Sequence, residues 1–139
     1  MTSEIIDKAL TALTSAKLLL SAGDSDGATN RAYYAMFDAA VAALAWAGEG
    51  AEQAHHKTHG GLIAAFGLHL VKAGHLSAEY GRSLNRVQEL RVTGDYMPAP
   101  VPADKAEWAV HEAEGFVEAV RRLLAQPRPP TAPRPAPAP

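Results

Sequence analysis

Apolar residues recur along the chain at intervals of three and four, which places them on one face of an α-helix. Over residues 3–21, which Ser3 can cap, the apolar stripe is made of Ile6, Ala9, Leu10, Leu13, Ala16 and Leu20. The same spacing predicts helices over residues 28–47, 57–72, 77–93 and 102–125. Runs that alternate apolar and polar residues, as half-buried strands do, are missing from the sequence. The pattern therefore predicts an all-α fold, an up-and-down bundle of four to five helices.

Glycine and proline mark the predicted helix boundaries. A turn cluster at residues 23–27 separates the first two helices, and glycines at positions 48 and 50 follow the second. Gly74 ends the third predicted helix, and Gly94 is expected to end the fourth. Residues 94–102 are then expected to form a loop that leads into the last helix at Pro102.

The length of 139 residues fits one domain with a single core. Residues 126–139 contain proline at a density that neither a helix nor a paired strand can accept. We therefore expect residues 1–125 to form the bundle and residues 126–139 to form a disordered, Pro-rich tail.

Charge and cysteine content narrow the function classes. The net charge is −2, so the chain as a whole does not attract nucleic acids, although its middle third is mildly basic and rich in histidine. The absence of cysteine excludes disulfides and thiolate metal sites. The sequence shows neither a basic, apolar leader nor an apolar run of membrane-spanning length. We expect a cytoplasmic protein that has no membrane contact and needs no metal or cofactor.

Polar side chains interrupt the alanine-rich segment at residues 30–40. Arg31 and Asp38 are seven residues apart, a separation that returns almost to the same side of a helix about 10 Å further along. Tyr34 lies on the same stripe. A helix face that presents an arginine, a tyrosine and a carboxylate can contact a phosphate.

Structural roles would also explain these residues. Arg31 can form an ion pair with an aspartate of the preceding turn, and Asp38 can hold a hydrogen bond or an ion pair across a dimer. The two adjacent tyrosines can be core or interface residues. His59 can simply sit at a helix start, and Arg91 with Asp95 can fix the loop expected after the fourth helix.

Several segments together resemble one family. They are Asn30-Arg31-Ala32-Tyr33-Tyr34-Ala35-Met36-Phe37, Lys57-Thr58-His59-Gly60-Gly61-Leu62-Ile63, and Leu90-Arg91 followed by Gly94-Asp95-Tyr96. In this order and spacing the sequence resembles the HEPN domain family (higher eukaryotes and prokaryotes nucleotide-binding), in its small stand-alone prokaryotic form. The resemblance covers residues 3–125.

The resemblance implies a helical bundle that usually forms a homodimer. In many members an arginine, four to six residues and then a histidine form a metal-independent ribonuclease site across the dimer. Such members are often toxins paired with a small nucleotidyltransferase antitoxin, whereas others are binding modules. Carried over to this chain, the arginine is Arg31, and Asp38 stands where the histidine would be after six intervening residues.

This departure matters for the chemistry. Metal-free RNA cleavage needs a base for the 2′-hydroxyl proton, an acid for the leaving oxygen and a cation for the transition state. Histidine can act as both the base and the acid because its pKa is about 6.5. An aspartate, with a pKa of about 4, is a poor acid at neutral pH. The activity is therefore expected to be weakened or lost, unless His59 enters the same cleft.

The sequence thus leaves two functions open. The first is a toxin-type or stress-response protein that binds RNA or nucleotide phosphate in a dimer cleft, with Arg31, Asp38 and His59 as catalytic candidates. The second is a non-catalytic dimeric module that binds a nucleotidyltransferase partner. Further binding candidates are Asn30, Tyr34, Lys57, Arg91, Asp95 and Tyr96.

Overall fold

The structure, a computed structural model, describes residues 2–48 and 58–130. Over these residues the chain forms helices and no strand. The helices are α1 (Thr2–Ser21), α2 (Ser25–Trp46), α4 (His59–Phe66), η1 (Gly67–Lys72), α5 (Ala78–Tyr96) and α6 (Ala103–Leu124). The π-helix η1 directly continues α4. The predicted all-α bundle is confirmed.

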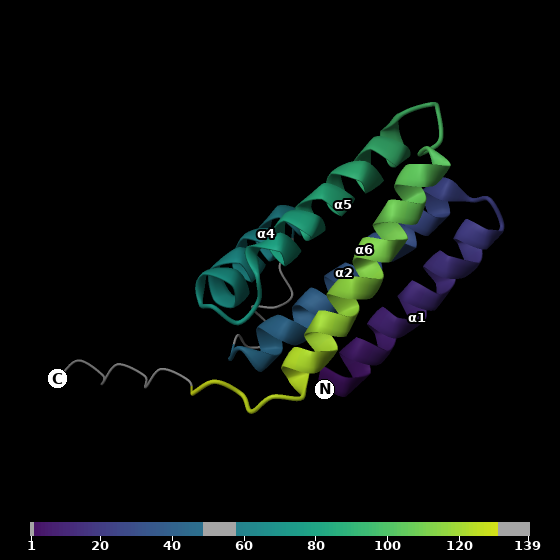
Figure 1. The fold of residues 1–139 in the computed structure, drawn as a ribbon. Coiled ribbons are helices and arrows are strands. Elements are labelled where there is room, and N and C mark those ends of the chain that lie inside the picture. The colour runs from purple at the N-terminus through teal and green to yellow at the C-terminus, as the bar shows by residue number, and fades with distance from the viewer. Residues whose placement is uncertain (1, 49–57, 131–139) are drawn as a thin grey trace.

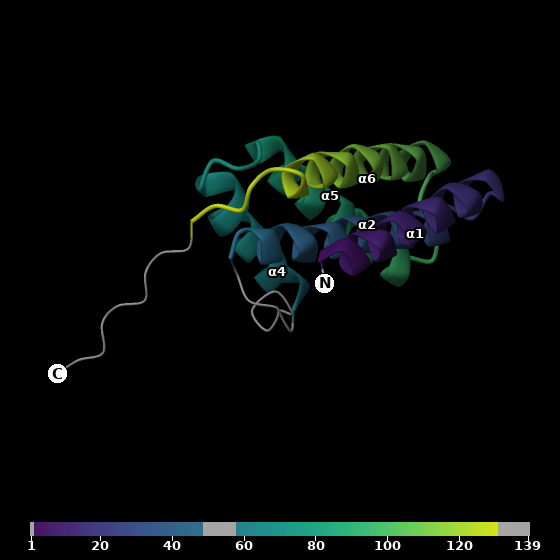
Figure 2. The ribbon, with the colours of Figure 1, turned by 90° about the horizontal axis from the view of Figure 1, so that it is seen from below.

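The helices run up and down along a common direction. Figure 1 shows α1 and α2 side by side, with α6 lying along the pair and α5 beside it. Figure 2, seen from below, shows α6 above the layer formed by α1 and α2, which agrees with the contacts of α6 to both helices. The α4–η1 segment packs against α2 and α5. No helix in the described part of the chain combines the length and apolar character that crossing a bilayer requires.

Helix α2 is the centre of the core. It contacts α1, α6, α5 and α4, and more than half of its residues are buried. Many of the buried residues are alanines, whose small side chains let neighbouring helices approach closely. Larger buried side chains, among them Tyr33, Met36 and Leu44 of α2 with Phe66 and Phe116, fill the remaining space. The predicted alanine-rich second helix is therefore the axis of the bundle.

Helix α2 starts earlier than its apolar pattern predicts. The expected start was residue 28, but the helix begins at Ser25 because the Asp24 carboxylate caps it. The backbone N–H of Gly27 donates to Asp24 Oδ1 at 2.8 Å. The turn is therefore shorter than predicted, with Gly23 in the turn and Gly27 in the first turn of α2.

The expected helix end at Gly94 is wrong, because α5 continues through Tyr96. A Cβ atom on Gly94 would lie 2.8 Å from Val101 Cγ2 and 3.2 Å from Asp26 Oδ1. The backbone N–H of Val101 donates to the same Asp26 oxygen at 2.8 Å. Glycine at position 94 therefore permits the returning chain to pass close to α5, rather than ending the helix.

The third predicted helix, over residues 57–72, is divided. Its N-cap is Thr58, whose hydroxyl accepts from the Gly61 N–H at 3.0 Å, and the helix changes from α to π at Gly67. This cap makes His59 the first residue of α4. Lys57 lies outside the described residues.

The first residues of the Pro-rich segment contact the bundle. The Trp46 indole N–H donates to the Gln126 carbonyl at 3.1 Å, and the Arg128 guanidinium donates to the carbonyls of Trp46 and Ala45 at 3.2 and 2.9 Å. These carbonyls end α2, where a cation is favourable. Residues 131–139 of the expected tail lie outside the described residues.

Candidate functional site

Arg31 and Asp38 line the same groove, as their sequence spacing predicts. This groove of about 380 Å³ runs between α1 and α2, and α1 contributes Glu4, Asp7 and Lys8 to it. Both α2 side chains are half-buried. The groove contains three carboxylates and two cations, so it is not a favourable place for a phosphate.

The electrostatics of Asp38 follow from this position. Burial raises the pKa of the Asp38 carboxyl, and the nearby charges of Lys8 and Arg31 only partly oppose that rise. Asp38 has no ion pair within 4.0 Å among the described residues. Its carboxylate is therefore held near two cations without a direct partner.

The Arg31 guanidinium also packs against Tyr34 of the same helix. Its guanidinium carbon lies 5.3 Å from the centre of the Tyr34 ring, within cation–π distance. In the described part of the chain Arg31 forms no ion pair. Its hydrogen-bond donors are therefore available to a ligand.

Beyond Tyr34 lies an aromatic cluster formed by the rings of Tyr33, Tyr34, Phe37 and His59. The imidazole meets each of the other three rings at a steep angle, with centroid distances of 5.3, 6.1 and 5.6 Å respectively. Tyr33 is completely buried, whereas the other three residues are half-buried. Tyr33, Tyr34 and Phe37 of α2 thus pack around His59, the first residue of α4.

A hydrogen bond holds His59 in this aromatic cluster. Tyr33 Oη lies 2.8 Å from His59 Nδ1. Burial raises the pKa of the Tyr33 phenol, so the hydroxyl stays protonated. Burial and the Arg91 charge lower the pKa of His59, which favours the neutral imidazole. We therefore assign the phenol as donor and Nδ1 as acceptor, which leaves the ring hydrogen on Nε2.

Arg91 brings a second guanidinium to the cluster from α5. Its guanidinium carbon lies 5.1 Å from the Tyr33 ring centre and 5.7 Å from that of Tyr34. Its Nη1 donates to Asp95 at 2.9 Å, and its Nε donates to Gln88 at 2.9 Å. Because α5 continues past Gly94, the Arg91–Asp95 pair spans one helical turn instead of fixing a loop.

The remaining candidates are spread more widely. Asn30 is half-buried on α2, and Asp95 is exposed. Tyr96 is 82% exposed at the end of α5. His59 is absent from the residues that line the Arg31–Asp38 groove. The structure therefore brings Arg31, Tyr34, His59 and Arg91 together, whereas Asp38 shares with Arg31 a groove that His59 does not line.

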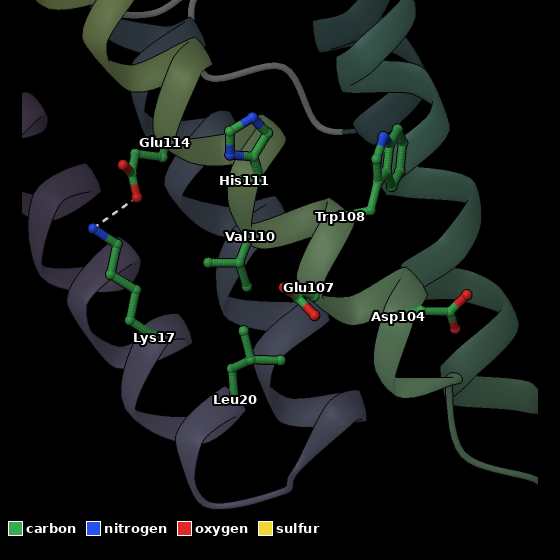
Figure 3. Close-up of a pocket in the computed structure, with 8 residues that line it drawn as sticks. All are labelled: Lys17, Leu20, Asp104, Glu107, Trp108, Val110, His111 and Glu114. Carbon is green, nitrogen blue, oxygen red and sulfur yellow. Dashed lines mark ion pairs between the residues drawn. The ribbon is translucent and has the colours of Figure 1, made fainter.

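Another groove, of about 470 Å³, lies between α1 and α6 (Figure 3). It contains none of the predicted site residues. Its lining is Lys17, Leu20, Asp104, Glu107, Trp108, Val110, His111 and Glu114. Within the described residues, no group of three or more histidine and acidic side chains is arranged to hold a metal ion.

A match to a protein-family model identifies the family of this chain. The model of the HEPN domain matches residues 2–123, almost the entire described chain. The chain belongs to the HEPN domain family. The resemblance inferred from its separate segments is thereby confirmed.

Curated relatives agree with this assignment. The HEPN chain is 34% identical to "Putative toxin MJ0605" of Methanocaldococcus jannaschii over 112 residues, which cover 81% of this chain and 80% of the relative. It is 36% identical to a protein of Thermotoga maritima named "UPF0332 protein", with 81% and 82% covered. A UPF0332 protein of Gloeobacter violaceus is 33% identical, with 88% and 95% covered.

The spacing of the HEPN motif also fits a second arginine of this chain. Four residues separate Arg91 from Tyr96, so a tyrosine stands where the motif would have its histidine. With Arg31, the corresponding residue is Asp38. At neither arginine does the chain supply the motif histidine, and His59 is the one imidazole that the described residues bring to the aromatic cluster.

Sequence reasoning missed the connection between Tyr33 and His59. The two residues are 26 positions apart, and their hydrogen bond depends on how α4 packs against α2. A weak signal existed, because a tyrosine beside Tyr34 on an alanine-rich helix must place its hydroxyl near a partner if it is buried.

Proposed function

We propose that this HEPN chain is a toxin-like protein that binds RNA through its phosphates at the surface formed by Arg31, Tyr34, His59 and Arg91. One observation supports this most strongly. Two guanidiniums lie within 6 Å of the centre of one tyrosine ring, beside an imidazole whose Nε2 has no hydrogen-bond partner among the described residues. Cations that hold phosphates beside an aromatic ring that can stack on a base are typical of single-stranded RNA binding. The name of the relative from M. jannaschii supports the toxin-like setting.

In this proposal any cleavage depends on His59 rather than Asp38. The Asp38 carboxylate lies in a groove with other acids, where it would repel the phosphate. His59 is neutral and, in the tautomer set by Tyr33, presents Nε2–H as a hydrogen-bond donor. In this form Nε2–H can donate a hydrogen bond to a phosphate oxygen, and Arg31 can stabilise the negative charge of the transition state. Transfer of a proton to the leaving oxygen would need the imidazolium form, which the lowered pKa of His59 disfavours, so any cleavage is expected to be weak.

The proposed site is completed by a second copy of the chain. Phe37 is a large aromatic residue of α2 that remains only half-buried in one subunit. Covering it would remove apolar surface from water and place the second subunit beside the RNA site. We expect a homodimer in light scattering at micromolar concentration, and Phe37→Glu should yield a monomer. A wild-type monomer would contradict the composite site.

The proposed RNA site is tested with labelled single-stranded RNA in the presence of a chelator. Arg31→Ala should weaken binding by about 10- to 150-fold, since a hydrogen bond to a charged group contributes about 1.5–3 kcal/mol. His59→Gln should leave binding nearly intact and lower any cleavage by about 10²–10⁴. The control is Arg122→Ala, which removes an exposed arginine near the end of α6. Equal binding by wild type and Arg31→Ala would refute the assignment.

A second candidate function is a non-catalytic module that binds a nucleotidyltransferase partner. The specific observation in its favour is that neither Asp38 nor Tyr96 is the histidine that the motif requires. Asp38→His separates the two functions. If only this variant cleaves RNA, the natural chain is a binding module.

A further inference from the structure

Trp108 is a large aromatic residue that the proposed site does not use. It lies on α6 and is 37% exposed. Figure 3 shows its indole projecting from α6 toward α5. The exposed part of the indole offers aromatic surface to a ligand.

The indole forms one wall of a groove between α5 and α6. The groove measures about 420 Å³ and is lined by Arg86, Glu89, Leu90, Thr93, Lys105 and Trp108. It lies on a different face of α5 from the proposed site, because Arg86 and Arg91 are separated by about 140° around the helix. The groove is therefore a separate surface.

Two cations in this groove are available to an anion. Arg86 and Lys105 are exposed, and neither forms an ion pair within the part of the chain that the structure describes. The groove contains one carboxylate, Glu89, which accepts a hydrogen bond from Asn85 at 3.4 Å. The groove thus has an excess of positive charge beside an aromatic wall.

The neighbouring groove between α1 and α6 is more acidic. Its lining includes Asp104, Glu107 and Glu114 with one lysine, Lys17 (Figure 3). In the α5–α6 groove Arg86 and Lys105 outnumber Glu89, so an anion is favoured between these two cations. This arrangement gives a bound ligand one orientation, with its flat part on the indole and its charge toward α5.

We propose that the α5–α6 groove is a second contact site for single-stranded RNA, where one base stacks on Trp108 and the adjoining phosphate lies between Arg86 and Lys105. The inference rests on the proposed function for the choice of RNA as ligand. The repeating unit of RNA pairs one flat base with one phosphate, which matches one indole with two cations. An acidic peptide would use the cations but leave the indole face without a stacking partner.

Binding of a fluorescein-labelled uridine decamer, followed by anisotropy, tests this groove. Base–aromatic stacking corresponds to an affinity change of about 5- to 150-fold, so Trp108→Leu should bind at least 5-fold more weakly. Arg86→Gln and Lys105→Gln should each reduce the slope of log K against log salt by about 0.7. The matched control Arg122→Gln, on the same helix as Lys105, should change neither quantity.

Tryptophan emission gives a direct readout. Trp46 is 5% exposed, so quenching by unlabelled decamer reports on Trp108 and should disappear in Trp108→Leu. Arg31→Gln should retain this quenching, which separates a failure of the first site from a failure of the groove. A folded Trp108→Leu protein that binds the decamer as tightly as wild type would overturn the proposal, as would polyglutamate competing as well as RNA.

Discussion

The hydrogen bond between Tyr33 and His59 leads to a prediction with an internal control. Tyr33→Phe removes a hydroxyl that lies 2.8 Å from Nδ1 and keeps the ring that packs against the imidazole. Tyr34→Phe makes the same chemical change one residue further along. The Tyr34 ring also contacts His59, but its hydroxyl forms no hydrogen bond among the described residues.

The expected magnitudes differ for the two variants. A buried hydrogen bond contributes about 1 kcal/mol net, and Tyr33 is completely buried. Tyr33→Phe should therefore lower the free energy of unfolding by about 1 kcal/mol, or the melting temperature by about 4 °C. Tyr34→Phe should change the free energy of unfolding by less than about 0.5 kcal/mol.

Urea unfolding followed by circular dichroism measures both values, and ¹⁵N NMR of the imidazole shows which nitrogen carries the hydrogen. In the wild type the hydrogen should reside on Nε2, and Tyr33→Phe should shift the population toward Nδ1–H. Equal destabilisation by the two substitutions would refute the reasoning. So would an Nδ1–H tautomer in the wild type.

Three further predictions follow from other contacts. Gly94→Ala should destabilise the protein by about 1 kcal/mol net in the same urea assay, because overpacking against Val101 costs more than the gain in helix propensity. Gly115→Ala should stabilise the protein by about 1 kcal/mol, because the space around its Cβ is open. Burial raises the pKa of Asp38, so ionisation of this carboxyl destabilises the fold as pH rises through the folded-state pKa. Asp38→Asn should therefore be more stable than wild type at pH 7, and the difference in melting temperature should vanish below about pH 4. Arg128→Ala should lower the free energy of unfolding by about 1 kcal/mol and shift the emission of Trp46 to longer wavelength, since the guanidinium no longer binds the carbonyls that end α2.

Local sequence signals were sufficient for several single helices. The apolar stripe of residues 3–21 predicted α1 to within one residue, and the predicted start at residue 77 agrees with α5, whose N-cap is Ser77. The shared helix face of Arg31 and Asp38 followed from their spacing, because both residues lie on one rigid helix. These results depend only on helical geometry. The opposite wall of their groove comes from α1, which the spacing does not indicate.

Local sequence signals failed where contacts with a second, distant segment determined the structure. Gly94 carries the local signature of a helix end, but its function is to admit Val101 and Asp26, which are distant in sequence. The change to a π-helix at Gly67 has no counterpart in the apolar pattern. The position of Arg91 over Tyr33 and Tyr34 likewise requires α5 to be docked on α2. Tertiary contacts of this kind are invisible to periodicity.

The placement of Asp38 changes how the missing motif histidine is understood. If Asp38 shared a cleft with the RNA phosphate, its negative charge would oppose binding, and the substitution would abolish function. The structure instead places Asp38 in a groove with charged residues of α1, and His59, which packs against Tyr34, does not line that groove. In the proposed site a phosphate beside Tyr34 would meet the guanidiniums of Arg31 and Arg91 and the neutral imidazole of His59. If RNA binds as we propose, loss of the motif histidine removes one catalytic group and leaves the proposed anion site, so RNA binding and RNA cleavage should respond separately to substitutions at Arg31 and His59.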